Sequence, residues 1–284
     1  MKVALAADDE IANHYDELPL WSAPFGQLIL EHVPLRRGQT VVDIGAGTGF
    51  LAVELAQRCG SESRIIAVDP WAEAMAVLRR KVDYLKLSNV ELVISDAAEL
   101  ALPDGSVDVV VSNLGINNFD NAARVLSECH RVLRPGGRLL LSTNLVGHMA
   151  EFYDAYRQVL DQFGLDLVPL DRHIDHRATI GSTAALLEAA GFVTSFVESS
   201  FRMRFADGTA LLNHYFIRLG FLDGWKSIVP AEDTDRVFTA LQAELNRRSE
   251  ATELSLTIPT ACFDAVAQPF GQAAQAEANI SSTV

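Results

Sequence analysis

The chain has 284 residues and a formal net charge of −14 at pH 7, with 23 lysines and arginines against 37 aspartates and glutamates. Non-specific binding to phosphate backbones depends on lysine and arginine, so this charge argues against a nucleic acid partner. Hydrophobic residues make up 49% of the chain, yet no apolar run reaches the ~18 residues of a membrane span, and no signal peptide is visible. The three cysteines lie far apart, without metal-type spacing. These features predict a globular, cytoplasmic protein.

The first predicted element is an amphipathic helix over residues 11–33, ending near Pro34. Short apolar runs follow, and each is rich in Val, Ile and Leu at nearly every position, which is typical of strands covered by helices on both faces. The predicted strands cover residues 40–44, 64–68, 90–95, 107–112 and 138–142, and the helices between them cover 48–59, 72–86 and 121–133. This alternation predicts right-handed crossovers and a doubly wound α/β fold with a parallel sheet. The adjacent cations Arg79, Arg80 and Lys81 are interpreted as a solvated helix face.

Past residue 144 the pattern changes. We predict a helix over 148–163, a polar connection with a proline over 165–177, a helix over 182–190 and a strand over 192–199. Residues 208–249 are predicted to be helical, with interruptions near Gly224 and Pro230, before a last strand over 254–266. The expected organisation is an N-terminal helical lid (1–36), an α/β core that binds the cofactor (37–145), a helical cover for the substrate (146–250, including the strand near 192–199), a last sheet strand (251–268) and a disordered tail (269–284).

The strongest local signal runs from Val41 to Phe50, where a buried strand enters a glycine turn and a helix begins. Glycines let the main chain turn tightly and let a ligand approach it, and the helix N-terminus offers unpaired N–H groups. Dinucleotide enzymes carry G-x-G-x-x-G, whereas Gly45, Gly47 and Gly49 are spaced G-x-G-x-G. A P-loop is excluded because no Gly-Lys-Ser/Thr follows.

Asp69 ends the second predicted strand. A carboxylate at this place can accept hydrogen bonds from both hydroxyls of an adenosine ribose. It can also cap the next helix, because Pro70 follows at a favoured first helical position. Both roles are compatible.

The run from Asp43 to Gly49, with Asp69, resembles the first two motifs of the class I S-adenosylmethionine-dependent methyltransferases. The resemblance continues through residues 95–97, 102–110, 112–113 and 131–137, and covers residues 11–145. It is greatest to the group of small-molecule methyltransferases that includes the ubiquinone/menaquinone-biosynthesis C-methyltransferases (methyltransferase domain 11/25-like). The resemblance implies a Rossmann-like, seven-stranded, mostly parallel sheet with S-adenosyl-L-methionine as the cofactor.

The resemblance also implies a role for each matching residue. Gly45, Gly47 and Gly49 would line the methionine part of the cofactor, with Asp43 ordering the loop behind them. Asp69 would bind the ribose.

The adenine would lie between further residues of the same motifs. Pro70 and Trp71 would lie near one face of the base, and Asp96 with the Ala97 backbone would read its edge. Tyr15 resembles an N-terminal aromatic residue that closes over the cofactor. Packing remains an alternative for Trp71 and Tyr15, and a turn or cap remains one for Asp96.

Asn113 and Leu114, after the fourth predicted strand, would approach the sulfonium through their backbone. The Asn/Asp-Pro-Pro-aromatic sequence of DNA amino-methyltransferases is missing here, and so are the cysteine clusters of arsenite-methylating relatives. The resemblance is therefore specific for cofactor and fold but not for the acceptor.

The substrate-side candidates are Trp21, Asn117, His148 and Tyr153. His148 follows the fifth predicted strand, at the carboxyl edge of the sheet, and an imidazole there can act as a general base. A capping or exposed histidine remains an alternative. The pair His173 and His176 lacks a third ligand at a recognisable spacing, so no metal site is predicted.

Methyl transfer from a sulfonium needs alignment and exclusion of water, and a base only if the acceptor must lose a proton. The sequence therefore predicts a methyltransferase acting on a small molecule, with His148 as the candidate catalytic residue. The alternatives are a non-catalytic protein that binds S-adenosylmethionine or S-adenosylhomocysteine, and an NAD(P)-linked oxidoreductase, which the glycine spacing disfavours. The oligomeric state stays open, a homodimer included.

Overall fold

The computed structural model describes residues 12–15, 19–251 and 253–269. These residues divide into two compact units, each described by itself below. The α/β unit contains residues up to 143, 179–198 and 261–269, and the helical unit contains residues 144–178 and 199–260. Residues 179–198, predicted as part of the cover, thus belong to the α/β unit. The predicted tail, beyond residue 269, lies outside the described residues.

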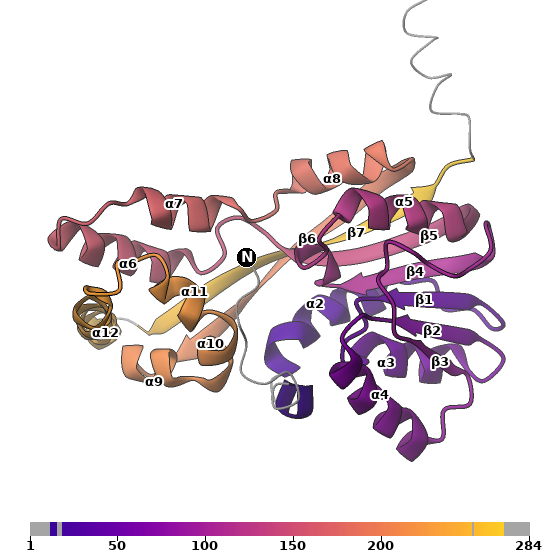
Figure 1. Ribbon diagram of the computed structural model, residues 1–284, viewed down its shortest axis with the longest axis horizontal. Coiled ribbons are helices and arrows are strands. Elements are labelled where there is room, and N and C mark those ends of the chain that lie inside the picture. Colours follow the sequence, from indigo (N-terminus) through magenta and orange to yellow (C-terminus); the bar gives the residue numbers. More distant parts are fainter. Residues whose placement is uncertain (1–11, 16–18, 252, 270–284) are drawn as a thin grey trace, which may run out of the picture. The chain divides into compact units, whose positions relative to one another are not determined.

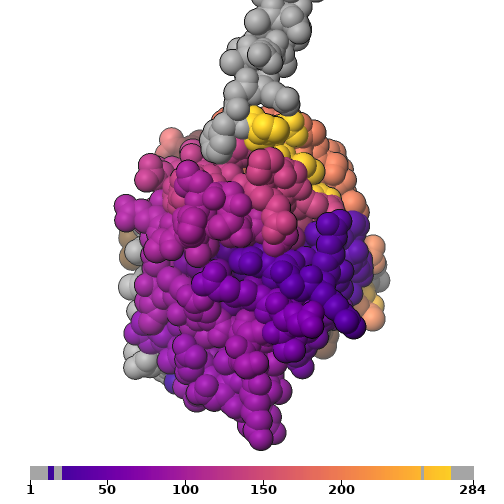
Figure 2. Space-filling view, turned by 90° about the vertical axis from the view of Figure 1, so that its right-hand side faces the viewer, coloured from indigo at the N-terminus to yellow at the C-terminus, as the bar shows by residue number. Residues whose placement is uncertain are grey.

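The α/β unit alternates strands and helices (Figure 1). In chain order it contains α2 (Pro19–His32), β1 (Thr40–Ile44), α3 (Phe50–Cys59), β2 (Arg64–Val68), α4 (Ala72–Leu85), β3 (Val90–Val93), β4 (Val107–Asn113), the short 3-10 helix η2 (Gly115–Asn117), α5 (Ala122–Val132), β5 (Leu133–Asn144, whose last residue falls in the helical unit) and α8 (Ile180–Ala189). Segments from α2 to α5, coloured indigo to magenta, make up most of the face of this unit seen in Figure 2.

The helical unit contains α6 (Ala150–Gln162), α7 (Val168–Asp175), α9 (Gly208–Asn213), α10 (Tyr215–Gly220), α11 (Leu222–Lys226) and α12 (Thr234–Ala251). Two long strands, β6 (Phe192–Phe205) and β7 (Leu254–Ala267), have residues in both units. None of the described helices is both long and apolar enough to cross a membrane.

The described strands form a seven-stranded sheet in the order β3-β2-β1-β4-β5-β7-β6 (Figure 1). The pairs β1–β2, β1–β4, β2–β3 and β4–β5 are parallel. β7 runs antiparallel to both its neighbours, as shown by the contacts Arg138–Asp264, Leu145–Pro259, Ser195–Asp264 and Gly191–Gln268. The predicted doubly wound, mostly parallel sheet is confirmed. Its strand order reverses between β1 and β4, the point where ligands bind in sheets of this kind.

Both faces of the sheet are buried, which explains why the strands are apolar at consecutive positions. Val41 of β1 packs in one cluster with residues of α2, α3 and α4, whereas its neighbour Val42 is equally buried but lies outside that cluster, on the opposite face. α5 buries Val125, Leu126, Cys129 and Val132 and contacts α8. Helices therefore cover the sheet on both sides.

All three cysteines of the chain lie in the α/β unit. Cys59, Cys129 and Cys262 are buried and reduced. Burial raises the pKa of all three thiols, and it raises those of Cys129 and Cys262 to about 12.

Two predictions about elements are wrong. Residues 165–177, predicted as a connection, contain the helix α7. Pro169 does not prevent this helix, because it stands in the first turn, where a missing N–H costs nothing. β6 extends to Phe205, well beyond the predicted end at residue 199, although most of its side chains after Phe192 are at least partly exposed.

Candidate functional site

The glycine turn between β1 and α3 is bound to the end of β2. Gly45, Gly47 and Gly49 have φ angles of 68°, 54° and 89°, a left-handed region that favours glycine. The N–H groups of Gly45 and Ala46 both donate to the Val68 carbonyl, at 2.9 and 3.2 Å. The turn is therefore held at the carboxyl ends of two neighbouring strands.

Two of these glycines are required for different reasons. A Cβ on Gly49 would lie 2.1 Å from Cδ1 of Leu78, a buried residue of α4, so packing excludes any side chain there. A Cβ on Gly47 would meet none of the described atoms within 4 Å. The main chain at Gly47 thus faces open space, as a ligand-binding backbone must.

Asp69 joins the glycine turn to the start of α4. It is 8% exposed, and its Oδ2 accepts a hydrogen bond from Gly47 N while its Oδ1 accepts one from Trp71 N, both at 2.8 Å. Burial raises the pKa of the Asp69 carboxyl, and the N–H groups of Trp71 and Gly47 act against that rise. Each carboxylate oxygen has a second lone pair, so both can still accept from ligand hydroxyls.

Asp43 lies behind the turn, as its implied role requires. Its carboxylate accepts a hydrogen bond from the N–H of Ala52 in the first turn of α3, where the N-cap residue Gly49 has no side chain to offer. Burial, with the charge of Asp69, raises the pKa of Asp43 to about 8. Its Oδ2 is buried without a hydrogen-bond partner among the described residues, which leaves a polar atom for a ligand.

The N-terminal aromatic residue lies against the second motif. The rings of Tyr15 and Trp71 meet edge to face with their centroids 6.0 Å apart, and Arg80 donates to Asn13 at 2.8 Å. Residues 12–15 are thus bound to α4 at the place where the adenine is expected.

The residues expected at the adenine edge form a turn after β3. Asp96 is exposed, and its Oδ1 accepts from Ala98 N at 2.8 Å, whereas Ala97 is only 3% exposed. Pro70 is exposed. The Asp96 side chain therefore forms the turn that was its alternative role, and its part in adenine binding stays a prediction.

Asn113 ties three elements together. Its side chain donates to the Ser22 carbonyl at 3.1 Å and accepts from Ser142 Oγ at 2.8 Å. Leu114 has a φ of 63°, and its N–H donates to the Ser142 carbonyl. These bonds fix the backbone after β4, which is the part that the resemblance assigns to the cofactor.

The substrate-side candidates divide between the two units. In the α/β unit, Asn117 accepts from Thr143 Oγ1 at 2.6 Å, and Trp21 packs on Phe25 with ring centroids 5.4 Å apart. His148 and Tyr153 belong to the helical unit. The structure thus brings the cofactor-side candidates together in one unit but does not group all four substrate-side candidates.

His148 is 2% exposed and stacks on Phe221 at a centroid distance of 5.5 Å. Burial, reinforced by the positive charges of Arg177, His173 and His176, lowers the pKa of His148 to about 3. An imidazole with this pKa is a weak base near neutral pH. Its burial favours packing over proton transfer, and its role as a base stays a prediction.

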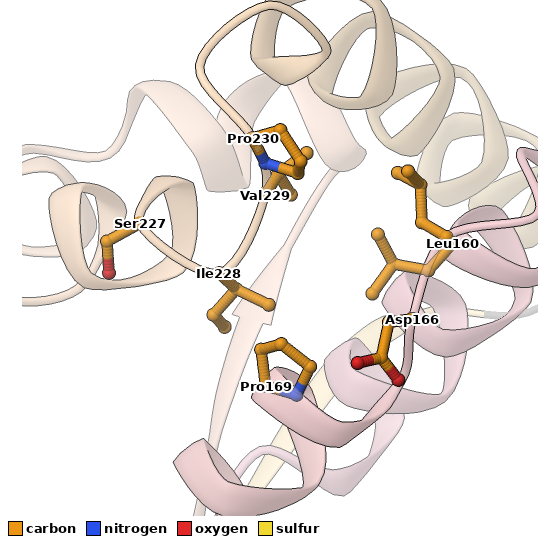
Figure 3. Close-up of a pocket in the computed structure, with 8 residues that line it drawn as sticks. Leu160, Asp166, Pro169, Ser227, Ile228, Val229 and Pro230 are labelled. Carbon is orange, nitrogen blue, oxygen red and sulfur yellow. The ribbon is translucent and has the colours of Figure 1, made fainter.

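Two further features bear on the site. A pocket of about 300 Å³ opens in the helical unit between the α6–α7 connection and the segment after α11 (Figure 3). It contains none of the candidates predicted from the sequence. No group of three or more His, Cys, Asp or Glu in the described part of the chain could hold a metal ion.

Sequence reasoning missed several contacts. Lys81, interpreted as part of a solvated face, donates to the Thr48 carbonyl of the glycine turn at 2.6 Å. Trp225, which is fully buried, and Arg177 carried no motif. Only the three-dimensional structure brings them near the candidates.

Comparisons with known proteins point the same way as the geometry. Residues 42–141 match the family described as the methyltransferase domain. The chain is 34% identical over 155 residues to an arsenite methyltransferase of Halobacterium salinarum. This match covers 55% of this chain and 37% of that protein. It is 33% identical over 135 residues to the ubiquinone/menaquinone biosynthesis C-methyltransferase UbiE of Enterobacter sp., covering 46% of this chain and 54% of that one. The match thus spans about half or less of these relatives.

Solved structures share the fold at lower identity. The YcgJ protein of Bacillus subtilis aligns with a TM-score of 0.57 at 18% identity, covering 86% of this chain and 97% of that one. A SAM-dependent methyltransferase of Aquifex aeolicus aligns with a TM-score of 0.53 at 22% identity, covering 67% and 91%.

The fold, the glycine turn with Asp69 and the family match define a class I S-adenosylmethionine-dependent methyltransferase domain. Within that class, residues 42–141 match the methyltransferase domain, and the chain is similar over part of its length to UbiE and to an arsenite methyltransferase.

Proposed function

We propose that this protein transfers a methyl group from S-adenosylmethionine to a small-molecule acceptor by in-line displacement. The observation that carries the proposal is the hydrogen bond from Gly47 N to Asp69 Oδ2. It joins the open main chain of the glycine turn to a carboxylate at the end of β2, next to the point where the strand order reverses.

The residues present fit the cofactor. Gly47 offers a main chain that no described side chain covers, and Oδ2 of Asp43, at the first motif, offers a polar atom without a hydrogen-bond partner among the described residues. We infer that Gly45, Gly47 and Gly49 hold the methionine part and that Asp69 binds the ribose hydroxyls.

The remaining cofactor contacts follow from the same assignment. Trp71 and Tyr15 would pack on the adenine, with Asp96 and the Ala97 backbone at its edge. Asn113 and Leu114, whose backbone is fixed on β5, would lie near the sulfonium.

S-adenosylmethionine supplies a methyl group on a good leaving group. The protein then has to align the acceptor with the methyl carbon and exclude water. The assignment requires no general base, in agreement with the low pKa of His148.

Calorimetry with S-adenosylmethionine, S-adenosylhomocysteine and NADH tests cofactor binding. We expect saturable binding of the first two and none of NADH; tight NADH binding without a response to S-adenosylhomocysteine would overturn the proposal. Turnover is tested by screening phenols, amines, carboxylates and quinone precursors for release of S-adenosylhomocysteine. Binding without release for any acceptor would instead support the non-catalytic alternative.

A further inference from the structure

A cluster of polar side chains lies on the aromatic core of the helical unit. Tyr153 of α6 is 4% exposed, and its hydroxyl lies 3.2 Å from Nε1 of Trp225 and 3.2 Å from Nε2 of His173. Trp225, fully buried, stacks on Phe152 with ring centroids 3.9 Å apart. The Tyr153 hydroxyl is thus held in place by the Trp225 N–H of α11, which donates to it, and by the His173 ring of α7.

Basic side chains surround this hydroxyl. Arg177 follows α7 and interacts with Tyr153 both by charge and by a hydrogen bond. The rings of His173 and His176 lie 5.7 Å apart. A bridge between Leu145 and Ala178 binds the two chain segments that carry the cluster. We call His148, Tyr153, His173, His176 and Arg177 the cationic cluster.

Among the described residues, no carboxylate forms an ion pair with the basic side chains of this cluster. Burial, together with Arg177 and His176, lowers the pKa of His173 to about 4, and the groups whose charge acts on His148 are also all basic. The acidic residues on α6, α7 and α11 are the exposed Asp154, Asp161, Asp175 and Asp223, together with Asp171, which pairs with Arg157 at 2.5 Å, and Glu151, which accepts hydrogen bonds from Thr257.

This arrangement is unusual for a chain with 37 acidic residues. Arg131 and Arg138, also partly buried, each form ion pairs with carboxylates. A guanidinium stays charged at any pH at which the protein is folded, and a partly desolvated cation without a counter-charge is costly. An anion from outside the chain would remove that cost through charge-assisted hydrogen bonds.

We propose that Arg177, His173 and Tyr153 bind the anionic group, a carboxylate or a phosphate, of a small-molecule ligand. Arg177 would contact the anion directly, and His173 and Tyr153 would complete its hydrogen bonds.

The site predicts a pH dependence with a defined sign. A bound anion stabilises the protonated form of His173, so its pKa rises in the complex. Binding therefore takes up a proton, and affinity increases as the pH falls from neutral towards the pKa of about 4 that His173 has in the free protein.

Calorimetric titration of the full-length chain with sulfate and with benzoate tests the site. Sulfate stands for phosphate because its charge is constant over this pH range, and benzoate stands for an aromatic carboxylate. We expect at least one of them to bind saturably, and Arg177→Gln to weaken that binding about 10- to 100-fold, as the loss of a charge-assisted hydrogen bond should. Arg172→Gln, an exposed arginine on α7, is the matched control and should bind like the wild type.

Three outcomes would overturn the proposal: no saturable binding of either anion, equal weakening by the two substitutions, or binding without proton uptake at about pH 6. Proton uptake is read from the buffer dependence of the binding heat on the wild-type protein, so the test survives if Arg177→Gln fails to fold. The titrations contain neither cofactor nor acceptor. Their result is therefore independent of whether methyl transfer is found.

Discussion

Asp69 is the residue on which the cofactor assignment depends most. Its two oxygens already serve Gly47 N and Trp71 N, so the carboxylate both shapes the turn and faces the proposed ribose. A residue with two roles needs a test that separates them.

We expect Asp69→Ala to weaken binding of S-adenosylhomocysteine by roughly 1.5–3 kcal/mol, the range for hydrogen bonds to a charged group. The melting temperature should fall as well, because two N–H groups lose their acceptor. Calorimetry on the folded protein, with thermal melting in parallel, measures both effects. An unchanged affinity with a lower melting temperature would make Asp69 purely structural.

At the scale of elements, the turn between β1 and α3 offers a matched pair of substitutions. Gly49→Ala places a methyl group against Leu78 and should lower the free energy of unfolding by about 2–4 kcal/mol, through overpacking and left-handed strain. Gly47→Ala meets no described atom and should cost only about 1 kcal/mol of strain.

Cofactor affinity should fall more in Gly47→Ala than in Gly49→Ala, the reverse of the order expected for stability. Gly47→Ala fills the space where the ligand is proposed, so its loss of affinity should exceed its loss of stability. Urea unfolding and calorimetry on both variants give the comparison. Equal stability losses would show that α4 moves to accommodate Gly49→Ala.

The sequence predicted the strands that are buried on both faces most accurately. β1 and β2 begin and end at the predicted residues, because an apolar run between turn signals has clear limits. β6 was predicted too short because the exposed polar residues 198–200 interrupt its apolar residues, although Phe201, Met203 and Phe205 beyond them alternate with Arg202 and Arg204 as in a strand with one covered face. α7 was missed because Pro169 indicates a loop unless its place in the first turn is known.

The candidate site also has a part that the sequence could predict and a part that it could not. The cofactor side follows from a short motif and from the adjacency of parallel strand ends, so Gly47, Asp69 and Trp71 could be placed together in advance. The placement of Tyr15 over the cofactor rested on resemblance alone, and its contact with Trp71 was not predicted. The cationic cluster joins residues from separate helices, and no spacing in the chain reveals that Tyr153, Arg177 and Trp225 meet.

At the scale of the whole chain, acid should weaken the fold through its buried histidines. The pKa of His148 is about 3 in the folded protein against 6.5 when unperturbed. Between these two pH values the unfolded chain therefore binds a proton at His148 that the folded protein does not bind. Stability is complete above pH 6.5 and is lost as the pH falls towards 3. At about pH 5 His148 alone should cost about 2 kcal/mol, since each pH unit counts for about 1.4 kcal/mol.

Chemical unfolding followed by the fluorescence of Trp225 measures this loss in the helical unit, after Trp21 and Trp71 are replaced by phenylalanine. His148→Phe keeps a ring against Phe221 and should unfold with a smaller acid dependence. His214→Ala, an exposed histidine of the same unit, should behave like the wild type. If His148→Phe and the wild type lose stability equally between neutral and acid pH, His148 does not set the acid response.

The three buried thiols can report local unfolding of the α/β unit. Cys59, Cys129 and Cys262 come from α3, α5 and β7, and their raised pKa values keep them protonated as well as covered. An alkylating reagent attacks the thiolate, so it reacts only with molecules in which the local structure has opened. The order in which the three sites are modified would then rank the opening free energies of α3, α5 and β7, without any label added to the protein.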